Sequence, residues 1–96
     1  MPSVCRVNDI CTGHDGFPPR PAMSGSPNVF VNGLPAHRLE DAWEFHSKPD
    51  NPSHDGVLAA GSSTVFVNGL PLGRIGDPIS CGSFVNSGSS DVFAGG

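Results

Sequence analysis

The sequence predicts an all-β fold of short hairpins, built from three similar units. Three observations predict it: an internal repeat, hairpin-turn signals within that repeat, and a composition that disfavours helices. Glycine and proline supply 13 and 10 of the 96 residues, and inside a helix they cost about 1 and about 3 kcal/mol each. The apolar residues form short β-branched and aromatic runs instead, which are typical of strands between turns.

The first repeated element contains a hairpin signal. Residues 25–35 read Gly-Ser-Pro-Asn-Val-Phe-Val-Asn-Gly-Leu-Pro, residues 61–71 are nearly identical, and residues 88–93 are a truncated third copy near the end of the chain. Asn-Gly favours a type I′ turn, which needs positive φ at both positions. We therefore expect residues 29–31 to pair with residues 38–39, and residues 65–67 with residues 74–75. Along the first strand, Val29 and Val31 should face one way and Phe30 the other.

The second repeated element is an arginine followed three residues later by an aspartate. Its copies are Arg6-Val7-Asn8-Asp9, Arg38-Leu39-Glu40-Asp41 and Arg74-Ile75-Gly76-Asp77. We interpret them as ion pairs or turn caps that organise each unit. Catalysis would need titratable groups that converge on one pocket, whereas these aspartates are dispersed, one per unit. Units too short to bury a face alone must pack together, here about a pseudo-threefold axis.

Length and charge restrict the function classes. Residues 1–96 make one domain. A net charge of −4 with only five basic residues argues against a nucleic-acid partner. No segment approaches the about 20 apolar residues of a membrane span, and the N-terminus lacks the apolar stretch of a signal peptide. We expect synthesis in the cytoplasm without a signal peptide. The odd number of cysteines, three, fits a thiolate ligand better than a disulfide framework.

Matched repeat positions carry four candidate metal ligands. His14 and His54 open identical His-Asp-Gly triplets, while His46 and Cys81 follow the aspartate of their units by five and four residues. Three imidazoles and a thiolate suit one tetrahedral Zn²⁺ ion. With all four positions filled by protein the site is closed and structural, which disfavours hydrolysis. Residues 48–53 contain two prolines, and we interpret them as a rigid loop between His46 and His54.

Other residues near this set have more than one interpretation. Cys11 forms a Cys-x-x-His pair with His14 and is the main rival ligand, although we interpret it as a small buried apolar residue. A disulfide between Cys5 and Cys11 would require an oxidising environment. We expect His37, which directly precedes a repeated arginine, at the surface, and Trp43 either in the core or packed around the metal site.

The chain resembles the PAAR family, named for a Pro-Ala-Ala-Arg motif. The motif positions are Pro35-Ala36-His37-Arg38 and Pro71-Leu72-Gly73-Arg74, and further marks are the doubled Gly-Ser-x-x-Val-Phe-Val-Asn-Gly, then Gly76-Asp77-Pro78 and Cys81. The tetrapeptide keeps only proline and arginine in both copies, and near the N-terminus an extra residue separates Pro2 from Arg6. The resemblance covers essentially the whole chain.

The resemblance implies a structural protein and no enzyme. It implies a sharp cone with one zinc near its apex, held here by His14, His46, His54 and Cys81. The wide base would bind a trimeric β-helical spike, either the VgrG protein of a type VI secretion system or the central spike of a contractile phage tail. The cap would sharpen this membrane-piercing spike, travel on it through the target envelope and contact the target membrane only transiently. With no room for a toxin extension, effectors would be separate proteins.

The threefold repeat explains how a single chain could dock on a trimeric spike. A single chain meets a trimer evenly only by presenting three similar faces, and strand edges at the base would extend the sheets of the spike. Two other functions are open at this point: a small zinc hydrolase that uses three of the four ligands, and a free-standing zinc-binding adaptor. The sequence does not distinguish a phage from a bacterial secretion system.

Overall fold

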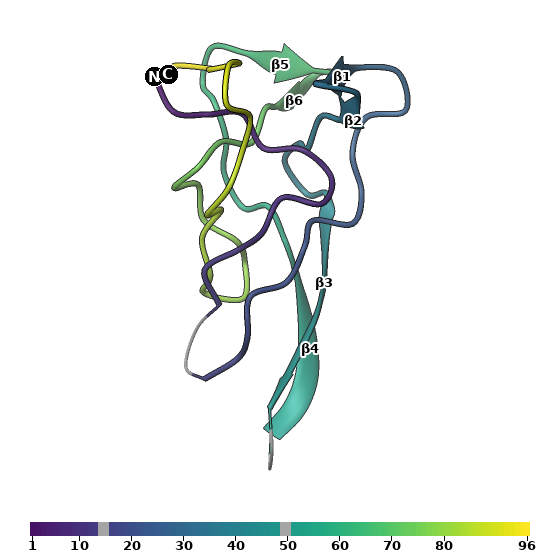
Figure 1. The fold of residues 1–96 in the computed structure, drawn as a ribbon, viewed down its shortest axis with the longest axis vertical. Coiled ribbons are helices and arrows are strands. Elements are labelled where there is room, and N and C mark those ends of the chain that lie inside the picture. Colours follow the sequence, from purple (N-terminus) through teal and green to yellow (C-terminus); the bar gives the residue numbers. More distant parts are fainter. Residues whose placement is uncertain (14–15, 49–50) are drawn as a thin grey trace.

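The computed structural model describes residues 1–13, 16–48 and 51–96, with residues 45–48 and 51–55 described by their backbone alone. Within these residues it contains no helix and three antiparallel two-stranded sheets. The strands are β1 (Phe30–Val31), β2 (Leu34–Pro35), β3 (Ala42–Lys48), β4 (Asn51–Val57), β5 (Phe66–Val67) and β6 (Leu70–Pro71). The predicted all-β fold of short hairpins is therefore confirmed. The molecule measures 40 × 24 × 22 Å and tapers from a wide end, which carries β1, β2, β5 and β6, to a tip formed by β3 and β4 (Figure 1).

The two Asn-Gly turns form the predicted hairpins, but with other partner strands. β1 pairs with β2 and β5 with β6, through positive φ at both turn residues of each hairpin. The expected partners, residues 38–39 and 74–75, were wrong. A two-residue turn places the residue after glycine directly opposite the residue before asparagine, so Leu34 must face Val31. Arg38 instead bridges Leu72 in the next unit.

The third hairpin is completed by the other end of the chain. Ser3 bridges Phe93, and the Val4 N–H donates to the Val92 carbonyl at 3.0 Å. The same bond recurs in the other two units, from Ala36 to Val29 and from Leu72 to Val65. The N- and C-termini accordingly lie together at the wide end (Figure 1). The third copy of the repeat is therefore interrupted rather than truncated, because the N-terminal segment supplies its second strand.

Three equivalent residues close a ring of backbone hydrogen bonds where the units meet. Cys5 N–H donates to Gly73 O at 2.8 Å, Gly73 N–H to His37 O at 2.9 Å, and His37 N–H to Cys5 O at 3.0 Å. We call these three residues the axial ring. Because His37 occupies it, its side chain has no exposed surface, and the expectation of a surface position was wrong.

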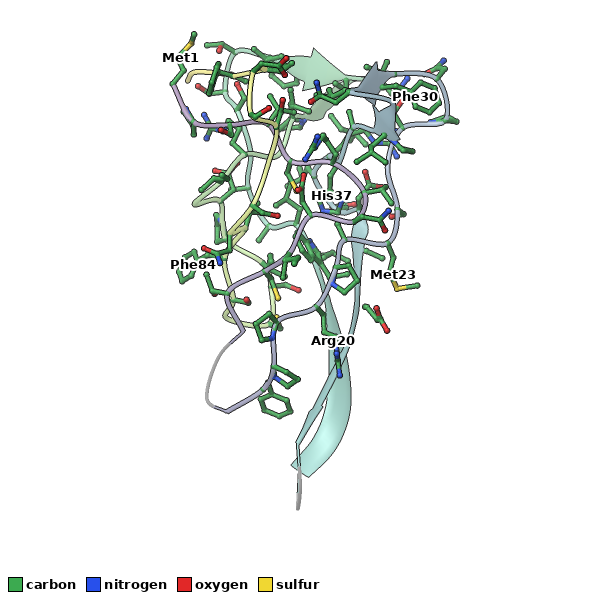
Figure 2. The ribbon with its side chains drawn as sticks, viewed as in Figure 1. Met1, Arg20, Met23, Phe30, His37 and Phe84 are labelled. Atoms are coloured by element: carbon green, nitrogen blue, oxygen red, sulfur yellow. The ribbon has the colours of Figure 1, made fainter. Side chains whose placement is uncertain are left out.

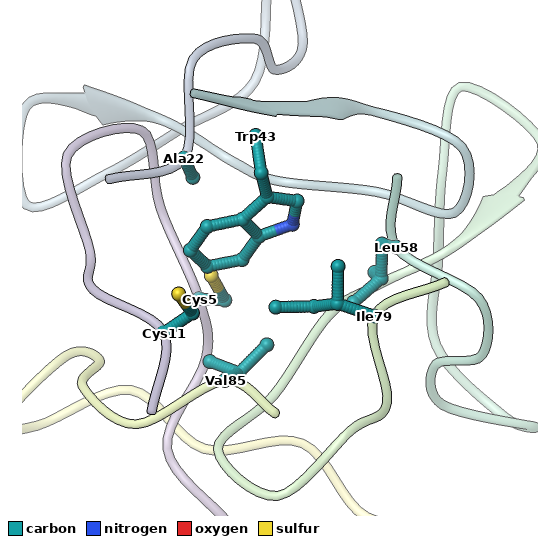
Figure 3. Packing of buried hydrophobic residues seen from close by; sticks show 7 residues of the cluster. All are labelled: Cys5, Cys11, Ala22, Trp43, Leu58, Ile79 and Val85. Atoms are coloured by element: carbon teal, nitrogen blue, oxygen red, sulfur yellow. The ribbon is translucent and has the colours of Figure 1, made fainter. Parts of the chain in front are cut away.

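The core consists of triads, each with one residue from every unit. The triad Ala22, Leu58 and Val85 is identified by its N–H groups, which all donate to the carbonyls of the repeated aspartates. Others are Val4, Ala36 and Leu72, and Cys11, Trp43 and Ile79. Three side chains that meet at one axis cannot all be large at native packing density, so each of these triads combines a small, a medium and a large residue. Figure 3 shows two of them, Ala22 with Leu58 and Val85, and Cys11 with Trp43 and Ile79. The predicted burial of Cys11 and Trp43 is confirmed.

The longest hairpin, β3–β4, breaks the similarity of the three units. Its register pairs Ala42 with Val57 and, nearer the tip, Lys48 with Asn51, with shifts between them. The rigid loop predicted for residues 48–53 was wrong where the chain is described, since Lys48 ends β3 and residues 51–53 begin β4. A two-stranded ribbon consists only of edge strands, which accept a proline such as Pro52.

Candidate functional site

Each unit is folded locally by one arginine–aspartate clasp. The carboxylate accepts the backbone N–H of the arginine at 2.8 Å in all three units. It also binds Nε and Nη2 of the guanidinium, at distances of 2.8 to 3.2 Å. The turn between the two residues needs positive φ, which is met by Asn8, Glu40 and Gly76. The interpretation of these pairs as organising ion pairs is confirmed.

The clasp of Arg38 and Asp41 favours the charged forms of both side chains. Burial alone would raise the pKa of Asp41, but hydrogen bonds from the Arg38 side chain and backbone bring it below its ordinary value. The carboxylate partners in turn raise the pKa of Arg6, Arg38 and Arg74, against the opposing effect of burial. A guanidinium and a carboxylate that both stay ionised near neutral pH do not exchange protons with a substrate.

A second set of hydrogen bonds joins the units to one another at the wide end. One buried serine per unit accepts two backbone N–H groups of its own strand and donates at 2.6 Å to the turn of another unit. The donations run from Ser26 to Asn68 Oδ1, from Ser62 to Gly95 O and from Ser89 to Asn32 Oδ1. Each of these oxygens also accepts Nη1 of one clasp arginine, at 3.0 to 3.1 Å. The wide end is thus a closed polar network whose donors are matched by acceptors.

Gly95 completes this network without a side chain. It occupies the position of Asn32 and Asn68, and its backbone carbonyl accepts the bonds that their side-chain oxygens accept. Gly96 keeps the positive φ of the other turn glycines, at 91°. Sequence reasoning missed this role, although alignment of the final Ala-Gly-Gly with the repeated Val-Asn-Gly carries the signal.

Above the network, the wide end exposes one Val-Phe pair per unit. The exposed fractions are 56, 54 and 48% for Phe30, Phe66 and Phe93. They are 37, 37 and 38% for Val29, Val65 and Val92. We call these six residues the base face, and Phe30 marks its position in Figure 2. The expected alternation holds for Phe30, which points outward, and for Val31, which packs on the core, but not for Val29, which is exposed.

At the narrow end, the structure brings together the backbones that carry three of the predicted metal ligands. His46 and His54 are Cα partners across β3 and β4. A Cβ added to Gly56, on the same strand as His54, would lie 3.2 Å from the Cys81 Sγ. Cys81 therefore lies against β4, two residues along the strand from His54, where a side chain at position 56 would crowd Ile79 and the Cys81 sulfur.

The fourth predicted ligand, His14, lies outside the described residues, as do the side chains of His46 and His54. The preceding segment is described: Gly13 N–H donates to Ser83 Oγ at 2.9 Å, and Thr12 N–H to Phe84 O at 2.8 Å. Up to Gly13, the chain therefore runs beside the loop of Cys81. Among the side chains that the structure does describe, no three metal-binding residues converge.

The other two cysteines lie in the core. The Cys11 sulfur is buried and accepts the Arg20 N–H at 3.3 Å. Cys5 carries a free thiol, so the disulfide considered for it is not formed, and burial raises its pKa. Figure 3 shows both residues packed with Trp43 and Val85.

The sequence model of the PAAR motif family matches residues 12–87. The chain belongs to the PAAR motif family. Members of this family are structural proteins that sharpen the tips of VgrG spikes in type VI secretion, and they often bind zinc. No curated protein matched the chain. In the part of the chain that the structure describes, no helix has the length and apolar character needed to span a membrane.

The structure explains which parts of the PAAR motif matter in each unit. The motif arginine forms the clasp, and the motif proline offers its carbonyl to another unit: Pro35 accepts the Val7 N–H and Pro71 the Leu39 N–H, both at 2.9 Å. In the third unit Ser3 takes the place of proline and accepts the Ile75 N–H at 2.9 Å. Every residue has a backbone carbonyl, so the imperfect N-terminal motif keeps this bond.

Proposed function

We propose that this PAAR protein caps the end of a trimeric β-helical, membrane-piercing spike and docks through the base face. The observation that carries the proposal is the near equality of the three Val-Phe pairs, whose exposed fractions differ by at most 8 percentage points between units. Three equal apolar contacts spaced around one axis match the end of a trimer. The proposal includes VgrG spikes and the central spikes of phage tails.

The base face is suited to docking because its support is rigid. Ser26, Ser62 and Ser89 fix the backbone directly before each Val-Phe pair. A preorganised apolar surface loses little conformational entropy on binding. Burial of three half-exposed phenylalanines would supply about 25 cal/mol for each Å² of apolar area removed from water.

Serine substitutions in the base face test the docking proposal. Each of Phe30→Ser, Phe66→Ser and Phe93→Ser should weaken binding to the cognate spike trimer about tenfold, and the triple variant should not bind. Phe84→Ser is the matched control, because Phe84 is as exposed as Phe93, at 48%, but lies on the flank (Figure 2). Binding is measured by titration of the trimer. Equal losses for Phe84→Ser, or full binding of the triple variant, would contradict the proposal.

We further propose that the narrow end holds one structural zinc ion through His14, His46, His54 and Cys81. Two described features support this donor set: the facing positions of residues 46 and 54 across β3 and β4, and the close approach of the Cys81 sulfur to Gly56. A thiolate with three imidazoles suits Zn²⁺. When bound, the ion would cross-link three segments of the chain, with no open position for an activated water, so we propose no enzymatic activity.

Elemental analysis tests the ligand set directly. Mass spectrometry of the purified protein should find about one zinc per chain, and His46→Ala should lose it. Phe66→Ser, in the base face at the other end of the molecule, is the control that should keep it. A cobalt-substituted protein whose spectrum changes on addition of anions would show an open site and favour the hydrolase instead.

A further inference from the structure

A buried imidazole in the axial ring has one partnered nitrogen and one without a partner. His37 has no exposed surface, and its Nδ1 lies 2.8 Å from the Ser24 carbonyl oxygen. A carbonyl only accepts, so Nδ1 carries the proton of the neutral ring and Nε2 carries a lone pair. Nε2 has no hydrogen-bond partner among the described residues.

The nearest aromatic neighbour supplies no acceptor. Trp43 meets the His37 ring edge-on, with ring centroids 5.0 Å apart and planes at 75°. Its Nε1–H is also buried without a partner in the described part of the chain. An indole nitrogen only donates. Protonation of His37 would therefore add a second N–H donor, and a positive charge, to a site that already has one unsatisfied donor.

The carboxylates near His37 are already bound by arginines. Asp41 and Asp9 attract a proton on His37, but both carboxylates are bound in clasps, with Arg38 and Arg6. Arg38, the next residue along the chain, repels it. The Cys5 thiol shares the ring and stays neutral, since burial raises its pKa. Burial is the main cause that lowers the pKa of His37, against the hydrogen bond to Ser24.

We propose that His37 makes the centre of the fold acid-sensitive: the axial ring closes around the neutral imidazole, and protonation of Nε2 opens it. The unfolded chain holds an ordinary histidine that titrates near pH 6.5. Because the folded protein resists protonation, stability is complete above that pH and is lost as the pH falls below it. This device is independent of docking and of zinc.

The pH dependence of unfolding in His37→Asn tests the proposal. An asparagine amide can still donate to Ser24 O but cannot titrate. Urea unfolding of both proteins at pH 7.5 and pH 5.0 yields the ratio of their unfolding constants. The other histidines are common to both proteins and cancel in the ratio. This ratio, wild type over variant, should rise up to about 30-fold between the two pH values. A ratio independent of pH would overturn the proposal.

Two measurements on the wild-type chain keep the test valid if His37→Asn does not fold. Ring ¹⁵N shifts should show His37 neutral and protonated at Nδ1, with no titration before unfolding. Fluorescence of Trp43, the single tryptophan, should stay constant down to the pH at which the chain unfolds, because an imidazolium at this contact would quench it. Titration of His37 near pH 6.5 in the folded protein would contradict the proposal.

Discussion

The wide and narrow ends of the molecule are stabilised in different ways. At the wide end all three units contribute equivalent groups, and each serine and arginine finds its acceptor on another unit or its own clasp. At the narrow end, among the described residues, only the middle unit forms a long hairpin, β3–β4, with seven residues in each strand. In the other two units the corresponding pairs are isolated bridges, Ile10 with Pro21 and Pro78 with Phe84.

The difference follows from the shape. The molecule narrows from β1, β2, β5 and β6 toward β3 and β4, so three equivalent copies surround the axis at the wide end, and the tip is formed by the β3–β4 hairpin (Figure 1). At the wide end the serine donors of each copy are bound by acceptors of another copy. Among the described residues, β3 and β4 have no equivalent strands to bind them in this way. An external cross-link, such as the proposed zinc, would compensate most where this symmetry is lost.

Removal of zinc should have the largest effect on stability, and it should affect the narrow end before the wide end. A structural zinc contributes on the order of 10 kcal/mol, so a strong chelator should lower the melting temperature by at least about 20 °C. Hydrogen exchange should show that the N–H groups of β3 and β4 lose protection first. The N–H groups that donate to Ser26, Ser62 and Ser89 at the wide end should lose it later. Simultaneous loss at both ends would show that they are one cooperative unit.

Loss of a clasp arginine should cost about 3 kcal/mol, because it leaves a largely buried carboxylate unpaired. Arg38→Leu tests the middle unit, where the side chains of Arg38 and Asp41 are only 14 and 10% exposed. Arg6→Leu and Arg74→Leu are its matched counterparts. Urea unfolding should show similar losses in the free energy of unfolding for the three variants. A much smaller loss for one of them would show that the three clasps are not equivalent.

A methyl group at the axis should cost about 2 kcal/mol by overpacking. A Cβ on Gly73 would lie 2.8 Å from Leu58 Cδ2 and 3.2 Å from the His37 carbonyl oxygen. Gly73→Ala combined with Leu58→Ala should cost less than the sum of the single changes, because the second change removes the clashing methyl. Strict additivity in thermal unfolding would contradict this packing.

The smallest expected effect concerns a serine present in only two units. Ser24 Oγ accepts the Ala42 N–H at 2.8 Å, and Ser87 Oγ accepts the Ile10 N–H at 2.9 Å. The unit of the Arg74–Asp77 clasp has Pro78, which lacks an N–H, at the corresponding position, and Ala60 in place of the serine. Ser87→Ala should cost about 1 kcal/mol, whereas Ala60→Ser should gain nothing in the same unfolding assay.

Structural features formed by neighbouring residues could be predicted from the sequence. Contacts between residues far apart in the sequence could not. Positive φ at Asn32 and Gly33, and the clasp from Arg38 to Asp41, involve residues at most three apart and follow from residue type. The burial of His37 depends on a bond to Cys5, 32 residues away, for which the sequence holds no local sign. The same holds for the bridge from Arg38 to Leu72. The predicted ligand set stays a prediction, since only Cys81 has a described side chain.

The sequence by itself determined the all-β class, the Asn-Gly hairpins, the clasps and the membership in the PAAR family, because turn chemistry and repeats are properties of neighbouring residues. Only the tertiary structure decided that the N-terminal strand completes the third unit, that the Gly95 carbonyl replaces an asparagine, and that the axial ring buries His37. These features arise when three units close around one axis. Closure brings together residues from opposite ends of the chain, and local propensity does not specify which of them meet.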